Sequence, residues 1–127
     1  MNLHEYQGKE ILASFGVNVQ RGIVADSPKK AVEAAQSLTE STGTAWHVIK
    51  AQIHAGGRGK GGGVKLAKTL DEVKSIAQEI IGMQLITPQT PPEGKTVQQI
   101  LIAEDVYYPG DTETSEIYLS VLLNRAY

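Results

Sequence analysis

Several common features are missing from this sequence of 127 residues, and each absence narrows what the chain can be. It contains no cysteine, which excludes disulfides, thiolate zinc sites and cysteine nucleophiles together. No apolar run approaches the roughly 20 residues that a membrane-spanning helix needs. The opening decapeptide MNLHEYQGKE has no apolar core of a secretory signal. We therefore expect a cytoplasmic protein without a membrane partner.

Excess positive charge is also absent, since the net charge is −2, and aromatic residues make up only 6% of the chain. The charges are nevertheless unevenly distributed. The segment from Trp46 to Lys68 contains five basic residues and no acidic one. A local basic segment in an acidic protein favours an anionic ligand held at one place. A small phosphorylated molecule fits this pattern better than a nucleic acid, which would need aromatic side chains to stack on its bases.

The hydrophobic fraction of 41% and the charged fraction of 20% are typical of a globular domain. Hydrophobic periodicity predicts three helices and several short strands. The expected fold is an α/β (α+β) domain, with a mixed or antiparallel sheet and helices packed on it. The helices are expected over residues 3–15, 28–40 and 70–81, and the strands over 22–25, 46–53, 64–67, 85–87, 97–103 and 117–123.

Capping signals mark where the helices begin. Asn2 with Glu5 reads as a capping box for the first helix. Ser27 followed by Pro28 predicts the start of the second helix, and Thr69 with Glu72 predicts the start of the third. The apolar strand expected over 117–123 would have an open edge as the sequence stops, so we expect a piece of a longer protein.

The most informative segment is the glycine loop, His54 to Gly63, which holds six of the thirteen glycines. Glycine allows several backbone N–H groups to approach one anion, and Arg58 and Lys60 add positive charge. The segment lacks the G-x-x-x-x-G-K-[ST] order of a P-loop, and a strand rather than a helix is expected after it. A flexible hairpin tip with solvated lysines is the alternative interpretation.

Lys50 lies in the strand expected over 46–53, which is apolar on both faces. A buried lysine needs water, a carboxylate or a ligand anion, because an unpaired charge costs several kcal/mol there. Four residues before a basic loop, a ligand anion is the favoured partner, and a side chain reaching to the surface is the alternative.

Carboxylates follow the strand expected over 97–103. Glu104, and Glu116 ahead of the last strand, are positioned to accept a ribose hydroxyl or to bind Mg²⁺. A solvated acidic loop is the alternative, and it is preferred for Asp111 and Glu113. The three histidines lack ligand spacing, so we expect no metal site in this chain.

Two stretches carry a resemblance to a known family. Residues 1–7 (MNLHEYQ) and 48–60 (VIKAQIHAGGRGK) are similar to the N-terminus of succinate–CoA ligase β subunits, and the similarity continues through 62–65 and 97–101. The β subunits of malate–CoA ligases and of citrate-cleaving relatives resemble the same region. Residues 107–115 look like an insertion relative to many relatives.

The resemblance implies that residues 1–127 are the N-terminal part of an ATP-grasp nucleotide-binding domain. It implies that Lys50 contacts nucleotide phosphate, that Gly57, Arg58 and Gly59 fold over the phosphates, and that residues after the strand at 97–103 line the adenine and ribose. Glu104 matches the carboxylate there, with Ala103 taking its place if the strand aligns without a gap. Glu116 matches a second nucleotide contact.

The family reaction converts succinate, CoA and ATP or GTP reversibly into succinyl-CoA, ADP or GDP, and phosphate, in the tricarboxylic acid cycle. The resemblance implies a partner α subunit that carries a phosphohistidine. It also implies Mg²⁺ with ligands outside this chain, so the chain alone is expected to be inactive. Two other hypotheses stay open, a non-catalytic phosphate- or RNA-binding module and a purely structural interaction lobe.

Overall fold

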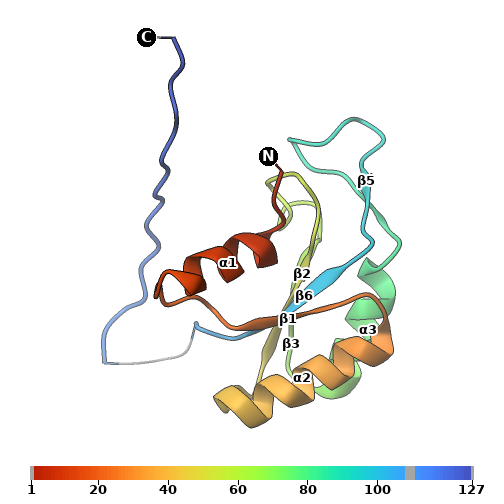
Figure 1. Cartoon of the computed structure of the whole chain (residues 1–127). Helices are drawn as coiled ribbons and strands as arrows, with labels where there is room; N and C mark the ends of the chain where they lie inside the picture. The colour runs from red at the N-terminus through yellow and green to blue at the C-terminus, as the bar shows by residue number, and fades with distance from the viewer. Residues whose placement is uncertain (1, 108–110, 127) are drawn as a thin grey trace.

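A four-stranded antiparallel sheet forms the centre of the computed structural model, which describes residues 2–107 and 111–126 (Figure 1). Every neighbouring pair of strands in this sheet is antiparallel, which confirms the antiparallel form of the expected sheet. β2 and β6 occupy the two central positions. In spatial order the strands are β1 (Gly22–Ala25), β6 (Ile100–Glu104), β2 (His47–Ala51) and β3 (Val64–Ala67).

Two helices cover one face of the sheet and form the core with it. α2 (Pro28–Thr42) and α3 (Leu70–Ile80) pack against each other, with α2 also over β1 and β6, and α3 over β2 and β3. α1 (Glu5–Ser14) lies on the opposite side of the sheet (Figure 1). Side chains alternate between the faces of a strand. The fully buried Ile49 therefore points towards α2 and α3, and Lys50 towards the side of α1.

The capping residues of α2 and α3 are those predicted from the sequence. The Ser27 hydroxyl accepts a hydrogen bond from the Lys30 N–H at 3.3 Å, and Thr69 accepts one from the Glu72 N–H at 3.1 Å. The predicted start of the first helix was wrong by two residues. α1 begins at Glu5, with His4 as its cap, and Gln7 Oε1 accepts the His4 N–H at 2.9 Å. Glu5 is thereby left without a capping role.

A second, two-stranded sheet lies beside the glycine loop. β4 (Gln84–Leu85) and β5 (Lys95–Thr96) are antiparallel, and the proline-containing turn connects them. The strand predicted over 85–87 is therefore shifted and shorter, and β5 was not predicted. β6 begins three residues later than the predicted 97–103 strand and ends on Glu104.

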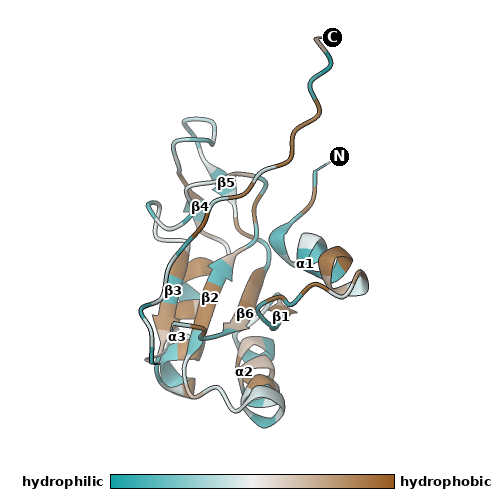
Figure 2. Ribbon diagram, turned by 90° about the vertical axis from the view of Figure 1, so that its left-hand side faces the viewer, coloured by the Kyte–Doolittle hydropathy of each residue, from teal (hydrophilic) through white to brown (hydrophobic). Residues whose placement is uncertain are grey.

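The strand expected over 117–123 is not present. Residues 113–126 have no regular structure, and the large apolar side chains from Ile117 to Leu123 are 81–91% exposed. Figure 2 shows this apolar stretch running away from the sheet. The prediction failed because apolar content alone does not make a strand. A strand needs a neighbouring edge to pair with, and within the described residues this segment has none.

Candidate functional site

The glycine loop is a structured turn that joins β2 to β3. Gly57 and Gly62 have φ values of 74° and 83°, which favour glycine. The Gly63 N–H donates to the Arg58 carbonyl at 2.8 Å, and the Lys60 N–H donates to the Gly57 carbonyl at 3.1 Å. These internal bonds argue against a flexible hairpin tip.

Other glycines of this loop are needed for close packing. A Cβ on Gly61 would lie 2.5 Å from the Ile86 carbonyl oxygen, and one on Gly63 would lie 2.7 Å from the Leu85 side chain. Gly59, by contrast, has open space around it. Within the part of the chain that the structure describes, no hydrogen bond uses the N–H groups of Gly57, Arg58 or Gly59. These are the three residues that the resemblance places over the phosphates.

Glu5 on α1 brings together the basic residues of this region. Its carboxylate lies 3.0 Å from Lys50 Nζ, 3.0 Å from Lys9 Nζ and 2.6 Å from Arg58 Nη1. Arg58 Nη1 also donates to the Ala51 carbonyl at 2.8 Å, at the end of β2. The two predicted phosphate-binding cations are therefore neighbours, although one comes from a strand and the other from a loop.

Burial and neighbouring charges have opposite effects on the pKa of Glu5. Burial alone would raise the pKa of Glu5, but the positive charges of Lys50 and Arg58 and the hydrogen bonds from Lys50 and Lys9 lower it to about 2. Burial lowers the pKa of Lys50, and contact with the Glu5 carboxylate opposes that fall. Glu5 is therefore ionised at neutral pH and favours the charged form of Lys50.

Gln20 connects this cluster to the end of β6. Its side-chain oxygen accepts from Lys50 Nζ at 2.8 Å and from Lys9 Nζ at 3.1 Å, and its Nε2 donates to the Glu104 carbonyl at 2.6 Å. The pairing of β2 with β6 sets Lys50 opposite Leu101. Glu104 thus lies three residues, roughly 10 Å, farther along the sheet.

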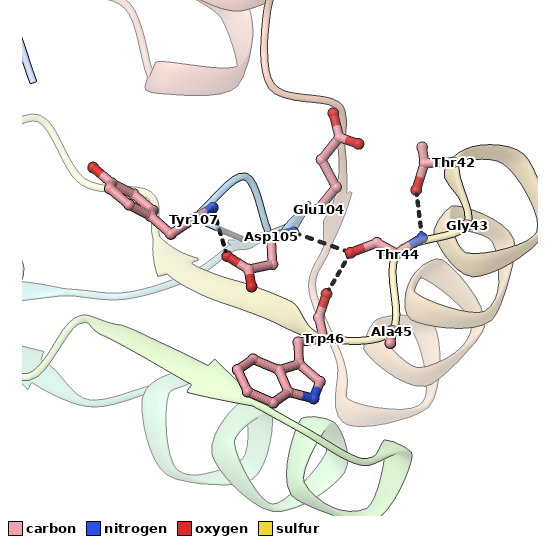
Figure 3. Close-up of a pocket in the computed structure, with 8 residues that line it drawn as sticks. All are labelled: Thr42, Gly43, Thr44, Ala45, Trp46, Glu104, Asp105 and Tyr107. Carbon is pink, nitrogen blue, oxygen red and sulfur yellow. Dashed lines mark hydrogen bonds between the residues drawn. The ribbon is translucent and has the colours of Figure 1, made fainter. Parts of the chain in front are cut away.

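A pocket of about 440 Å³ lies at this far end (Figure 3). Its walls are the turn after α2, the residue before β2 and the residues that follow β6. The Asp105 N–H donates to the Thr44 hydroxyl at 3.1 Å, and Asp105 Oδ1 accepts the Tyr107 N–H at 3.0 Å. The Trp46 ring forms one side, with Lys68 Nζ 4.8 Å from its centroid.

The carboxylate of Glu104 points away from the Trp46 ring (Figure 3) and accepts the Arg21 N–H at 2.9 Å. The register sets Ala103 opposite Val48, on the same face as Lys50. Position 103 therefore faces the cation cluster, whereas the Glu104 side chain turns to the edge formed by Arg21. Ala103 and Glu104, the two positions considered for the nucleotide-contacting carboxylate, thus have their side chains on different sides of β6.

Glu116 is not brought to this cluster. It lies in the exposed segment 111–126, which makes no hydrogen bond to the sheet among the described residues. Its predicted nucleotide contact stays a prediction.

Two residues of the cluster, Glu5 and Gln20, were missed as site residues, because the sequence offers no signal that joins them to a lysine 30 or 45 residues away.

His4 and His54 stack with their ring centroids 4.0 Å apart, beside Arg58. Burial, with the charges of His54 and Arg58, lowers the pKa of His4.

Within residues 2–107 and 111–126, no three His, Asp or Glu side chains form a group that could hold a metal ion. No helix in these ranges has the length and apolarity needed to cross a membrane.

An antiparallel sheet backed by helices, with a glycine loop and clustered cations on its other face, is an arrangement suited to a phosphorylated ligand. A family model for the ATP-grasp domain matches residues 2–127, so the chain belongs to the ATP-grasp family. This confirms the fold class inferred from the sequence.

The curated relatives are more specific. The chain is 75% identical over 125 residues to the succinate–CoA ligase [ADP-forming] subunit beta of Flavobacterium johnsoniae, covering 98% of this chain and 32% of that protein. It is 74% identical over 126 residues to the protein of the same name from Christiangramia forsetii, covering 99% of this chain and 32% of the relative. The chain thus spans about a third of the length of these relatives. The resemblance to succinate–CoA ligase β subunits is confirmed.

Proposed function

We propose that residues 1–127 are the N-terminal part of the nucleotide-binding domain of a succinate–CoA ligase β subunit. The observation that carries the proposal is the convergence of Lys50 and Arg58 on one carboxylate. Two cations from different elements within reach of one anionic group can equally serve two oxygens of a polyphosphate. The membership of the ATP-grasp family supports a nucleotide as that polyphosphate.

In this proposal Lys50 and Arg58 bind the phosphates, and the N–H groups of Gly57, Arg58 and Gly59 supply hydrogen bonds without the crowding of a Cβ. Glu104 and the pocket beside it lie at the other end of β6, where the ribose and base of an extended nucleotide would bind. Glu116 is proposed as a second contact there. The adenine form is favoured over guanine, because the relatives are named ADP-forming.

The parent reaction follows from the names of the relatives. A succinate–CoA ligase joins succinate to CoA and converts a nucleoside triphosphate to the diphosphate and phosphate. The resemblance implies a partner α subunit whose phosphohistidine carries the phosphoryl group. The resemblance places the ligands of a nucleotide-bound Mg²⁺ outside this chain, and we propose the same arrangement here. In this proposal the complete ligase is a complex of both subunits in the cytoplasm and acts in the tricarboxylic acid cycle.

The nucleotide claim is tested by calorimetric titration of the chain with ADP and ATP in the presence of Mg²⁺. Lys50→Ala and Arg58→Ala are expected to weaken binding by at least about ten-fold, because each loses a charge-assisted contact. Lys29→Ala is the matched control, since Lys29 is exposed on α2, on the other face of the sheet. Equal affinity in all four proteins, wild type included, would contradict the proposal.

The part that this chain plays in the parent reaction is tested in a chimaera. This chain replaces the equivalent residues of the Flavobacterium johnsoniae β subunit, which is expressed with its α subunit. We expect formation of succinyl-CoA with ATP, and loss of that activity with Lys50→Ala. A chimaera that is folded but inactive with ATP, while the unmodified Flavobacterium johnsoniae enzyme is active, would contradict the proposal.

A further inference from the structure

We propose that Glu5 is a positioning residue for the nucleotide phosphates: it fixes Lys50 and Arg58 in one arrangement while leaving donors of both free for the ligand. This inference rests on the function proposed above. It assigns a role to an acidic residue of α1 that the sequence marks only as part of a helix start. The alternative is that Glu5 occupies the phosphate position itself and competes with the nucleotide.

The number of donors decides between these roles. Lys50 Nζ has three N–H donors, and the described residues take up two of them, at Glu5 and at Gln20. Arg58 has five N–H donors, and its contacts to Glu5 and to the Ala51 carbonyl both use Nη1. Both side chains are therefore oriented by Glu5 and still have hydrogen bonds to give.

The charges lead to the same conclusion. One carboxylate faces three cations, Lys9, Lys50 and Arg58, so the cluster keeps a net positive charge with Glu5 ionised. An anionic ligand is still attracted to it. Without the carboxylate, the three cations repel one another, and separate conformations of these long side chains become favourable.

The position of Glu5 is fixed by more than its ion pairs. Glu5 is the first residue of α1, and the N–H of the next residue, Tyr6, donates to Gln52 Oε1 at 3.2 Å. Gln52 is buried directly after β2 and also donates to the Lys50 carbonyl at 3.2 Å. The start of α1 is thus attached to the same strand that carries Lys50, which gives the carboxylate a defined place.

The test compares Glu5→Gln with wild type by calorimetric titration with ADP and Mg²⁺. Glu10→Gln is the matched control, since it removes the same charge from an exposed position of the same helix. We expect Glu5→Gln to bind ADP about ten-fold more weakly at pH 7 and Glu10→Gln to bind it as wild type does. Glu5→Asp, which keeps the charge on a shorter side chain, should recover part of the affinity.

The pH dependence separates positioning from a general loss of structure. The titratable and charged groups around the carboxylate are Lys9 on α1, Lys50 on β2 and Arg58 in the loop, with His4 and His54 beside Arg58. Removing the Glu5 charge lowers the pKa of Lys50 further, so more of it is neutral at alkaline pH. The affinity deficit of Glu5→Gln should therefore grow between pH 7 and about pH 9.

Three outcomes are decisive. Equal or tighter ADP binding by Glu5→Gln, with wild type binding ADP and Lys50→Ala weakened, overturns this inference and leaves the proposed function in place. No binding by folded wild type overturns the proposed function and this inference with it. If Glu5→Gln does not fold, as judged by circular dichroism, Glu5→Asp takes its place in the test. The inference expects Glu5→Asp to bind ADP more weakly than wild type. Wild-type ADP affinity and a wild-type pH profile in Glu5→Asp overturn the inference.

Discussion

Arg58 in the glycine loop and Glu5 in the first helix form an ion pair of 2.6 Å, and both side chains are only about one-fifth exposed. The same carboxylate also binds Lys50 at the end of the central strand β2. Three separate elements of the chain therefore meet at one acidic side chain. This arrangement has consequences for stability as well as for ligand binding.

The first consequence is a dependence of stability on acid. The pKa of Glu5 falls from 4.5 to about 2 on folding, so its contribution is complete above about pH 4.5 and is lost as the pH falls towards 2. The unfolded chain takes up the proton first, which favours unfolding. Allowing for solvent screening, we expect a loss of about 2 kcal/mol in the free energy of unfolding over this range.

Urea unfolding at pH 7, 4.5 and 2.5 measures this loss. Other carboxylates titrate in the same range, so the comparison is between wild type and Glu5→Gln. The difference in stability between the two proteins should shrink towards pH 2.5. A difference that is constant with pH would show that the ionised carboxylate is not what stabilises the fold.

The glycines of the loop are expected to separate into two groups. Gly61→Ala places a Cβ 2.5 Å from the Ile86 carbonyl oxygen, a backbone atom that cannot move aside easily. We expect it to lower the free energy of unfolding by about 1–3 kcal/mol. Gly59→Ala has open space and no left-handed φ, so its stability should be unchanged or slightly higher.

ADP affinity should show the reverse order for these two glycines, with a larger loss in Gly59→Ala than in Gly61→Ala. Gly59 has no structural need for a missing Cβ, so a loss of ADP affinity in a fully stable Gly59→Ala would mark a close approach of the ligand. Urea unfolding and calorimetric titration of the same preparations give both quantities. Wild-type ADP affinity in Gly59→Ala would remove Gly59 from the proposed phosphate loop.

The parts of the fold that the sequence predicted correctly depend on local signals. Ser27 with Pro28, and Thr69 ahead of an amphipathic segment, determine two helix starts within a few residues of chain, and the structure has both. The His4–Gln7 start of α1 was missed, because Asn2 and Glu5 satisfied the same capping pattern. Two overlapping local signals cannot be ranked without the tertiary contacts of Glu5.

The candidate site was predictable only in part. Basic charge and glycine content marked Lys50 and Arg58, and the structure brings them together. Their shared partner was not marked, since a single glutamate on a helix usually faces water. The direction of Glu104 depends on the end of β6 and on the Arg21 backbone, which no pattern of alternation predicts.

The cap of α3 gives a further prediction. Thr69→Ala removes the acceptor for the Glu72 N–H and leaves a donor unsatisfied at the start of the helix. We expect a loss of about 1 kcal/mol in the free energy of unfolding, measured in urea. Thr114→Ala, in the exposed segment, is the matched control and should change stability by less than about 0.5 kcal/mol. Equal effects of the two changes would argue against capping as the role of Thr69.

Two valines test the contrast between the core and the segment 111–126. Val73 on α3 is fully buried, whereas Val121 is 91% exposed. Val73→Ala should lower the free energy of unfolding by about 2 kcal/mol, since it removes two buried methyl groups and leaves a cavity. Val121→Ala should leave it unchanged within about 0.5 kcal/mol, because the side chain has no packing to lose. A comparable loss in Val121→Ala, measured by the same urea titration, would mean that the segment packs on the domain in solution.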